Sequence, residues 1–401
     1  MSLPDGWKTI KLYQVTGNKG LFIDGDWVES KDQDPNGDVR LIQLADIGIG
    51  QFLDKSSRYL TSEKAKFLNC TYLEEGDLLV ARLPEPIGRC CIFPKLNQAC
   101  VTAVDVCIVR PDLNLVNTTW LMWYFNSPRL QKLVKSYVTG TTRKRISRKN
   151  LQNLQIPLPP IDEQRRIAAI LDQADAIIRK RQQAIALTDE LLRSTFLEMF
   201  GDPVINPMGW EVVELEEVCH KITDGTHQPP EWAADGIPFL FVSNIVNGEI
   251  DFNVNKYITK SCWTSLTARC PIEVNDILYT TVGSYGNAAL VRTTKSFCFQ
   301  RHIAHLKPNS AKINPEFLLG LMQSNGIKKQ ADKQVRGIAQ KTLNLRELKK
   351  FQIFLPPLML QNKYVRFRRK TENCLNKITT SFQQSNNLFN SLLQRAFKGQ
   401  L

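Results

Sequence analysis

Two long stretches of the chain carry apolar residues at steps that alternate between four and three. The first runs from Ile161 to Phe200 without a proline or glycine, and the second starts at Leu358. The stepped positions are Ile167, Leu171, Ala174, Ile178, Arg181, Ile185, Thr188, Leu192, Thr195 and Met199, then Tyr364, Arg368, Thr371, Leu375, Ile378, Phe382, Ser385, Phe389, Leu392 and Ala396. This spacing indicates a coiled-coil seam with a few polar interruptions. We therefore predict two helices, each about 60 Å long, whose seams can satisfy one another.

Each predicted helix follows nearly the same ten residues, QIPLPPIDEQ from Gln155 and QIFLPPLMLQ from Gln352. Proline lacks the amide hydrogen that a first helical turn leaves unpaired, and it pushes the preceding residue out of the helical region. The pairs Pro159-Pro160 and Pro356-Pro357 therefore predict where the helices begin.

The match between the two halves extends upstream at a constant separation, from Val138 over Val335 to the proline pairs. Near the start of each half, GWKTIKL from Gly6 matches GWEVVEL from Gly209. Each half reads as a β-rich region, a short helix, a polar or basic loop, the proline motif and a long helix. A repeat of this length indicates a duplicated domain rather than a solenoid unit.

The matching segments LLRSTF and LLQRAF lie at a larger offset than the rest of the repeat. They begin at Leu191 and Leu392. This offset predicts that the second long helix holds four extra residues, about one turn.

These patterns predict an α+β protein. It consists of two similar β-rich α/β domains joined by two long antiparallel coiled-coil helices, with an internal pseudo-twofold duplication. The expected boundaries are 1–157 for the first domain, 158–200 for the central helix, 201–354 for the second domain and 355–401 for the C-terminal helix. A chain of 401 residues is long enough for two separate cores.

The charge balance points to a polyanionic partner. There are 52 Lys and Arg residues against 39 Asp and Glu residues, a formal net charge of +13. A protein this basic gains affinity for a phosphate backbone by releasing counterions. No apolar run approaches the roughly 20 residues of a membrane span, and the N-terminus carries no signal core, so we expect a cytoplasmic protein whose ten cysteines are buried free thiols.

Catalytic and metal-binding signatures are missing from the sequence. There is no phosphate-binding loop of the Gly-x-x-x-x-Gly-Lys type, and QPPEW from Gln228 lacks the arrangement that holds an amino group for methylation. His302 and His305 follow Cys298, but the alternating pattern of that segment sends the two imidazoles to opposite faces of a strand. The sequence therefore predicts binding surfaces rather than a catalytic centre or a metal site.

Charge alone fits nucleic acid or acidic lipid, and the candidate binding surfaces are the polar and basic loops between the β-rich elements and the proline motifs. Their basic side chains suit phosphates, and their polar side chains suit base edges. The candidate residues are Arg82, Arg89, Arg143, Lys144, Arg145, Arg148, Lys149, Thr226, His227, Gln228, Ser284, Tyr285, Asn287, Gln340 and Lys341. The alternative for each loop is a turn with a structural role only.

Several motifs together resemble one protein family across the whole chain. They are the Pro-Pro-x-x-Glu-Gln core formed by Pro159, Pro160, Glu163 and Gln164, the Asp-Gly-Thr-His element that begins at Asp224, and the FLPP that precedes the last helix. A duplicated chain with these motifs resembles the specificity subunit of type I restriction-modification enzymes.

The resemblance implies a function and a set of partners. Each domain would be a target-recognition domain that reads one part of a split, asymmetric double-stranded DNA sequence, and the helices would set the separation of the parts. Two methyltransferase subunits would dock through Pro159, Pro160, Glu163, Gln164, Pro356, Pro357 and Gln361, and motor-nuclease subunits would join through that core. S-adenosylmethionine, ATP and Mg are expected in the partner subunits, and neither a cofactor nor a catalytic centre is expected in this chain.

The second motif departs from the first, because Phe354 replaces Pro157 and Leu360 replaces Glu163. The loss of an acid near a helix N-terminus costs about 0.3–1 kcal/mol and leaves open whether the two docking sites are equally strong.

Two other readings remain open from the residues alone. A coiled-coil adaptor that binds protein without DNA specificity fits the long helices, although the net charge argues against it. A stand-alone enzyme is disfavoured by the missing catalytic motifs.

Overall fold

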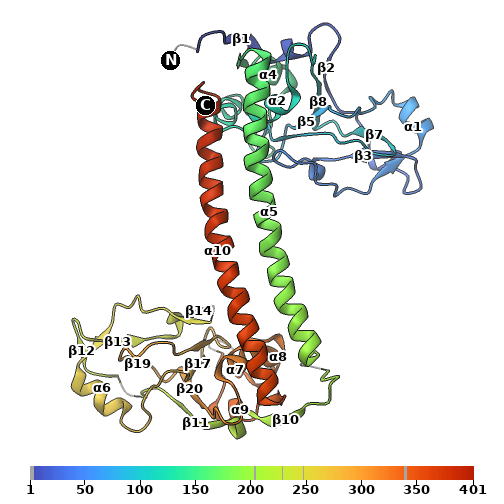
Figure 1. Cartoon of the computed structure of the whole chain (residues 1–401). Coiled ribbons are helices and arrows are strands. Elements are labelled where there is room, and N and C mark those ends of the chain that lie inside the picture. Colours follow the sequence, from blue (N-terminus) through green and yellow to red (C-terminus); the bar gives the residue numbers. More distant parts are fainter. Residues whose placement is uncertain (1–3, 203–204, 228, 247, 338–340) are drawn as a thin grey trace. The chain divides into compact units, whose positions relative to one another are not determined.

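The computed structural model describes residues 4–202, 205–227, 229–246, 248–337 and 341–401. The chain divides into a first unit, Met1–Gln183 with Ile378–Leu401, and a second unit, Ala184–Lys377. The two long helices are α5 (Ile161–Phe200) and α10 (Leu358–Ala396), and each unit contains opposite ends of them (Figure 1). The protein is therefore an α+β chain with two sheet-rich units and two long helices.

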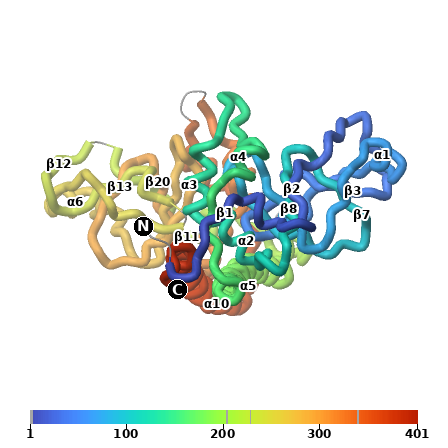
Figure 2. Tube along the Cα trace, turned by 90° about the horizontal axis from the view of Figure 1, so that it is seen from above, coloured from blue at the N-terminus to red at the C-terminus, as the bar shows by residue number. Residues whose placement is uncertain are grey.

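The first unit is built on one antiparallel sheet and a smaller mixed sheet. The larger sheet has the strand order β2 (Leu21–Asp24), β8 (Val106–Arg110), β5 (Leu78–Ala81) and β6 (Cys90–Ile92). The smaller sheet has the order β4 (Tyr59–Leu60), β3 (Val39–Ile42) and β7 (Ala99–Thr102). A separate pair is formed by β1 (Lys8–Lys11) and β9 (Gln155–Leu158). In Figure 2, β3, β7 and the short helix α1 (Ser62–Phe67) lie together, apart from α3 (Pro128–Ser136) and α4 (Arg148–Gln152). The first unit thus has a lobe of its own around the smaller sheet.

Successive side chains of β5 pack into two different hydrophobic cores, because the side chains of a strand alternate between its faces. Leu78 and Val80 belong to the core under the helices, while Leu79 and Ala81 belong to the core between the sheets. All four residues are buried, which explains why this strand reads as a continuous apolar run.

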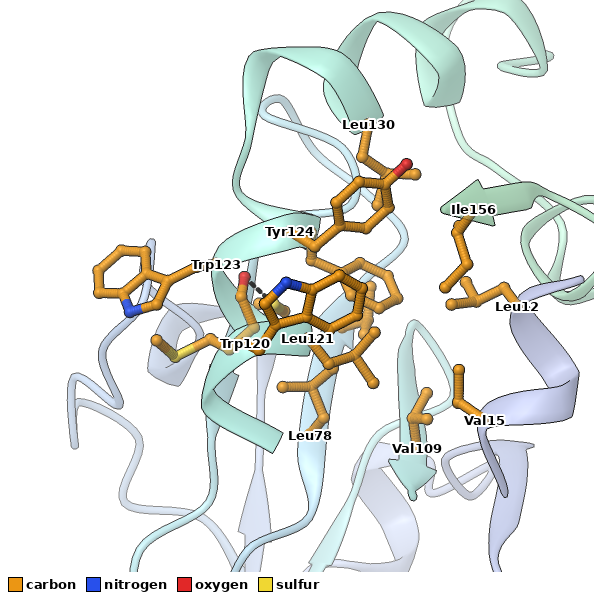
Figure 3. Close-up of a cluster of buried hydrophobic side chains, with 14 of the residues drawn as sticks. Leu12, Val15, Leu78, Val109, Trp120, Leu121, Trp123, Tyr124, Leu130 and Ile156 are labelled. Carbon is orange, nitrogen blue, oxygen red and sulfur yellow. Dashed lines mark hydrogen bonds between the residues drawn. The ribbon is translucent and has the colours of Figure 1, made fainter. Parts of the chain in front are cut away.

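The main core of the first unit gathers around helix α2 (Thr118–Phe125). Trp120 stacks on Tyr124 at 5.6 Å between ring centroids, and both rings meet Phe397 from the end of α10. Figure 3 shows the Trp120 indole inside this cluster while Trp123 points away from it. Trp123 instead donates to Asp172 of α5 at 2.7 Å, so α2 contacts both long helices.

The second unit repeats this order of elements. One four-stranded sheet has the order β11 (Cys219–Asp224), β20 (Ile303–Pro308), β17 (Ile277–Thr280) and β18 (Ala288–Leu290). The other has the order β12 (Trp232–Ala233), β16 (Tyr257–Ile258), β13 (Ile237–Leu240) and β19 (Cys298–Phe299). Two further pairs are β10 (Glu211–Glu214) with β21 (Gln352–Leu355) and β14 (Ile245–Val246) with β15 (Glu249–Ile250). Its helices are α6 (Lys260–Thr267), α7 (Pro315–Met322), α8 (Asn325–Gln334) and α9 (Leu345–Lys349). Phe317 takes the place of Trp120 and packs on Phe200 at 5.0 Å.

A buried glutamine fixes the start of each long helix to its unit. The Oε1 atom of Gln164 accepts from the Asn117 amide at 2.8 Å, and its Nε2 donates to the Pro159 carbonyl at 2.9 Å. Gln361 makes the same pair of bonds, to the Asn314 amide at 2.8 Å and the Pro356 carbonyl at 2.8 Å. Both glutamines are fully buried, so these bonds satisfy backbone groups that water cannot reach.

The predicted difference in helix length is wrong. Helix α5 has 40 residues and α10 has 39, and Phe200 and Phe397 occupy matching places under α7 and α2 at the separation of the rest of the repeat. LLRSTF and LLQRAF were matched in the wrong register, because a shift of four residues, about one turn, places apolar residues on the same face of the helix. The prediction for the cysteines holds in part: all ten are free, but only five are buried and Cys374 is exposed.

Candidate nucleic-acid interface

A glycine follows β2 in the first unit and β11 in the second, and each glycine lies against the backbone of a neighbouring segment. A Cβ atom on Gly25 would lie 2.4 Å from the Ala103 carbonyl oxygen, and one on Gly225 would lie 2.2 Å from that of Phe299. Any side chain would clash, so these positions require glycine. The Asp-Gly-Thr-His element is thus a strand end whose close backbone contact positions the residues that follow.

In the second unit, backbone hydrogen bonds join three loops beside this turn. Arg301 donates to the Thr226 carbonyl at 3.0 Å, and Thr281 donates to the His302 carbonyl at 2.9 Å. Gly283 donates to the Lys341 carbonyl at 2.9 Å. The predicted residues Thr226, His227 and Lys341 therefore belong to one connected group of loops.

The imidazole of His227 is available at the surface. Its side chain is 65% exposed, and its Nε2 lies 2.9 Å from Asp224 Oδ2. Thr226 is half-buried, and Lys341 is exposed. These polar groups can reach a ligand without rearrangement of the core.

In the turn that contains Ser284, Tyr285 and Asn287, two of the polar side chains form hydrogen bonds within the unit. The Asn287 side chain donates to the Ser284 carbonyl at 3.0 Å, and the Tyr285 hydroxyl donates to Asp332 at 2.8 Å. This hydrogen bond raises the pKa of Tyr285, and Lys328 Nζ lies 3.7 Å from the centre of its ring. Ser284 and Asn287 stay exposed, whereas Tyr285 is held against α8.

In the first unit, the two predicted arginines of the Arg82-to-Arg89 turn point inward. Arg82 is 7% exposed, and its Nε lies 3.1 Å from Asp24 Oδ1, an ion pair that lacks hydrogen-bond alignment. Burial raises the pKa of Asp24, although Arg82 and Arg148 oppose this. Arg89 donates to the carbonyls of Ile47 at 2.8 Å, Leu44 at 3.0 Å and Pro84 at 2.8 Å. The Arg82 guanidinium also donates to the Val104 carbonyl at 2.7 Å, so both guanidinium groups hold backbone in place rather than form an exposed surface.

The basic loop after α3 is exposed and has a counterpart after α8. Thr139 and Arg145 exchange two backbone bonds of 2.9 Å around Gly140, which has φ +98°. Arg336 and Thr342 exchange bonds of 3.0 and 2.8 Å in the same way. Five basic side chains are exposed in this region: Arg143, Lys144 and Arg145 in the loop, and Arg148 and Lys149 at the start of α4. Lys144 and Lys341 precede the pairing residue in their respective loops, so one lysine occupies the same position in both units.

Two predicted residues, Gln228 and Gln340, lie outside the described residues. Three residues that the sequence did not mark as candidates for this surface also belong to it. Arg301 and His302 form the turn before β20, and Arg301 lines two cavities beside Thr226 and Thr281. Trp27 follows the Gly25 turn and is 70% exposed. Only Trp27 had a sequence signal, because Asp24-Gly25-Asp26 resembles Asp224-Gly225-Thr226.

The residues predicted to dock partners divide into buried and exposed groups. Pro159, Gln164, Pro356 and Gln361 are buried, whereas Pro160 and Pro357 are exposed. Glu163 accepts two bonds of 2.8 Å from Arg166, which lower its pKa. The exposed prolines and this ion pair are the parts of the motif that a partner can touch.

The remaining ligand types find little support in the described part of the chain. No group of three metal-ligating side chains occurs there. His305 is buried instead, with Nε2 at 2.6 Å from Asp276 and Nδ1 at 3.4 Å from the Cys270 thiol. None of the described helices is long and apolar enough to cross a membrane.

Comparison with known families shows what kind of protein has this architecture. The model of the family described as "Type I restriction modification DNA specificity domain" matches residues 4–187 and again residues 207–387. The chain therefore belongs to the family of type I restriction-modification specificity subunits.

Individual relatives agree with this family. The EcoBI specificity subunit of Escherichia coli is 27% identical over 309 residues, 70% of this chain and 65% of that protein. The MjaVIII specificity subunit of Methanocaldococcus jannaschii is 25% identical over 279 residues, 63% of this chain and 64% of that protein. The chain thus spans slightly less than two thirds of the length of these two relatives.

Solved structures share the fold. The S subunit of a type I restriction-modification system from M. genitalium has 14% identity and a TM-score of 0.58, over 99% of this chain and 98% of that chain. A chain from a solved type I R-M system, studied for its complex assembly and conformational transition, has 19% identity and a TM-score of 0.57, over 100% of both chains.

Proposed function

We propose that this chain is the sequence-specific DNA-binding subunit of a type I restriction-modification complex. Each unit reads one half of a bipartite double-stranded target, and the helices set the spacing between the halves. The chain itself has no catalytic centre and binds no cofactor. Two methyltransferase subunits and motor-nuclease subunits supply the chemistry with S-adenosylmethionine, ATP and Mg.

The observation that carries this proposal is the pair of matching exposed loops after α3 and α8. Each loop is pinned by a reciprocal backbone pair and exposes a lysine, Lys144 or Lys341, at the same position. Repeated cationic loops on a chain of net charge +13 suit phosphate contacts at two similar half-sites. Because the side chains around these loops differ, the two half-sites differ in sequence.

We further propose that the chain arose by internal duplication. The residue ranges proposed for it are 1–157 and 201–354 for target recognition and 158–200 and 355–401 for the coiled-coil spacer. The recurrent Gln164 and Gln361 bonds support a common ancestor, since both satisfy the same backbone groups. The exposed Pro160 and Pro357 and the partly buried Glu163 are the candidate methyltransferase contacts, and the buried glutamines support them from beneath. Arg82 and Arg89 drop out of the proposed DNA surface because their guanidinium groups hold backbone.

The test is methylome sequencing of cells that express this chain with its methyltransferase. We expect one asymmetric bipartite motif, and we expect His227→Ala to relax one half-site only, because His227 belongs to the second unit. Lys180→Ala, a change of an exposed lysine on α5, is the control that leaves both half-sites intact. Relaxation of both half-sites together by His227→Ala, or the absence of any methylated motif, contradicts the proposal.

A further inference from the structure

A cavity of about 310 Å³ opens beside the Thr226–His227 turn of the second unit. One wall is aromatic, and the rim is polar. Its lining includes Thr226, His227, Trp232, Phe241, Gln300 and Arg301. A volume near 300 Å³ is at the small end for ligand pockets and suits a single planar ring system.

The aromatic wall is formed by Trp232 of β12, Phe239 of β13 and Phe241, which follows β13 directly. Trp232 meets Phe239 edge-on at 5.1 Å and lies nearly parallel to Phe241 at 6.4 Å between centroids. Phe239 is buried and fixes the other two, while Trp232 remains 42% exposed. A large aromatic face that is held rigid and left accessible is a stacking platform.

The rim offers hydrogen-bond donors, acceptors and positive charge. Gln300 contributes an amide, and His227 contributes an imidazole. Burial and the neighbouring Arg301 lower the pKa of His302, which favours the neutral ring with one donor and one acceptor. The exposed Arg301 provides a cation at the mouth of the cavity.

The first unit lacks this wall. Leu41 and Gln43 occupy the positions that Phe239 and Phe241 hold in the second unit. The local hydrogen bonds show this correspondence, because the Gln43 amide donates to Asp46 Oδ2 at 2.8 Å and the Phe241 amide donates to Asn244 Oδ1 at 2.9 Å. Among the described residues of the first unit, no strand corresponds to β12. The aromatic cavity is therefore a property of one recognition unit and not of the shared frame.

We propose that this cavity binds one unstacked nucleobase of the DNA half-site that the second unit reads. The base stacks on Trp232 and Phe241, its edge bonds with His227 and Gln300, and Arg301 contacts the adjoining phosphate. This inference rests on the proposed function. Extrusion of a base from a duplex costs a few kcal/mol, which stacking and edge contacts in a pocket offset.

The experiment uses the full chain co-expressed with its methyltransferase and duplexes of the methylated motif. 2-Aminopurine replaces one base of the second half-site at a time, and its fluorescence rises when it leaves the helix stack. Besides the base that the methyltransferase itself extrudes and methylates, we expect a rise at one further position, loss of that rise with Trp232→Ala, and binding weaker by about 10-fold. Trp232→Phe keeps an aromatic face and should keep the signal, and Phe67→Ala, a change of an exposed ring on α1, should leave it unchanged.

The outcomes separate this inference from the function on which it rests. Specific binding of the duplex with no fluorescence rise apart from that at the methylated base overturns the base site and leaves the proposed function standing. If the rise at the further position persists in Trp232→Ala, the base site is also overturned. If Trp232→Ala instead loses methyltransferase co-purification with that fluorescence unchanged, the cavity is a protein-docking site. Absence of specific duplex binding by the unaltered chain overturns both.

Discussion

The two units use one backbone frame but treat the same internal position in opposite ways. In the first unit, the side chain of Arg82 fills the space beside Asp24 and donates to the Val104 carbonyl at 2.7 Å. In the second unit, Thr281 holds the equivalent backbone position, and a cavity of about 250 Å³ lined by Asp224 and His302 remains open. The comparison teaches that two units with the same frame can diverge by filling or emptying a site without changing the strands around it.

A second difference concerns buried charge. Asp77 pairs with Arg110 at 2.7 Å in the first unit, whereas the equivalent Asp276 pairs with His305 at 2.6 Å and with Lys307 at 3.0 Å. The strand position of His305 is occupied in the first unit by Ile108, which is fully buried. The second unit thus carries a buried imidazole where the first has only apolar contacts.

The largest expected effects come from the ring at the centre of each core. Trp120→Ala should destabilise the first unit and Phe317→Ala the second, each by about 3–5 kcal/mol, because a large buried side chain leaves a cavity. Hydrogen exchange read separately in each unit measures the loss. Trp120→Phe is the control, expected to cost under about 1.5 kcal/mol, since Phe317 fills the matching place and the Trp120 Nε1 atom has no partner within the described residues. Equal losses in both units from a single change would contradict the separation of the cores.

The next largest loss of stability is expected from removal of the buried glutamine hydrogen bonds. Gln164→Leu and Gln361→Leu leave a buried amide and a carbonyl without partners, at a cost of about 1–3 kcal/mol. Denaturant unfolding with exchange at the start of α5 or α10 measures the loss. Gln182→Leu, on the exposed face of α5, is the matched control and should change little. If both buried changes behave like the control, the glutamines do not hold the helices to their units.

A smaller effect is expected from the matching lysines of the two loops. Lys144→Ala and Lys341→Ala should each lower the slope of log affinity against log salt concentration by about 0.9, the value for one lost phosphate contact. Binding of the target duplex at several salt concentrations measures this slope, with Lys180→Ala as the control. A changed slope for only one lysine would show that the two loops contact DNA unequally.

The smallest expected effect is a loss of stability at low pH. Burial would raise the pKa values of Asp276 and Glu316, but hydrogen bonds from His305 to Asp276 and from Arg369 and Arg292 to Glu316 lower them overall. Carboxyls with depressed pKa values stabilise the fold above their unfolded values and lose that contribution as pH falls through the folded values. The second unit should therefore weaken below about pH 4, near the reference values of these groups.

The stability of the first unit should change less in acid, because some of its carboxyls have raised pKa values and another has a lowered one. Burial raises the pKa values of Asp24 and Asp26, so their protonation favours the folded state as pH falls, whereas Asp46 has a lowered pKa through hydrogen bonds that outweigh burial. Exchange in each unit between pH 7 and pH 3 measures the difference. Earlier opening of the first unit would reverse the predicted order.

The sequence by itself determined the repeat, the points where the long helices begin and the presence of exposed basic loops. Pro159-Pro160 and Pro356-Pro357 act on the backbone next to them, and apolar periodicity reports a helix through its own geometry, so both signals are local. Only the tertiary structure decided that Gln164 and Gln361 face inward, that Arg82 pairs with Asp24, and that Arg301 adjoins Thr226. These outcomes depend on partners far away in the chain, and the direction and burial of a side chain are settled by such contacts rather than by the residues beside it.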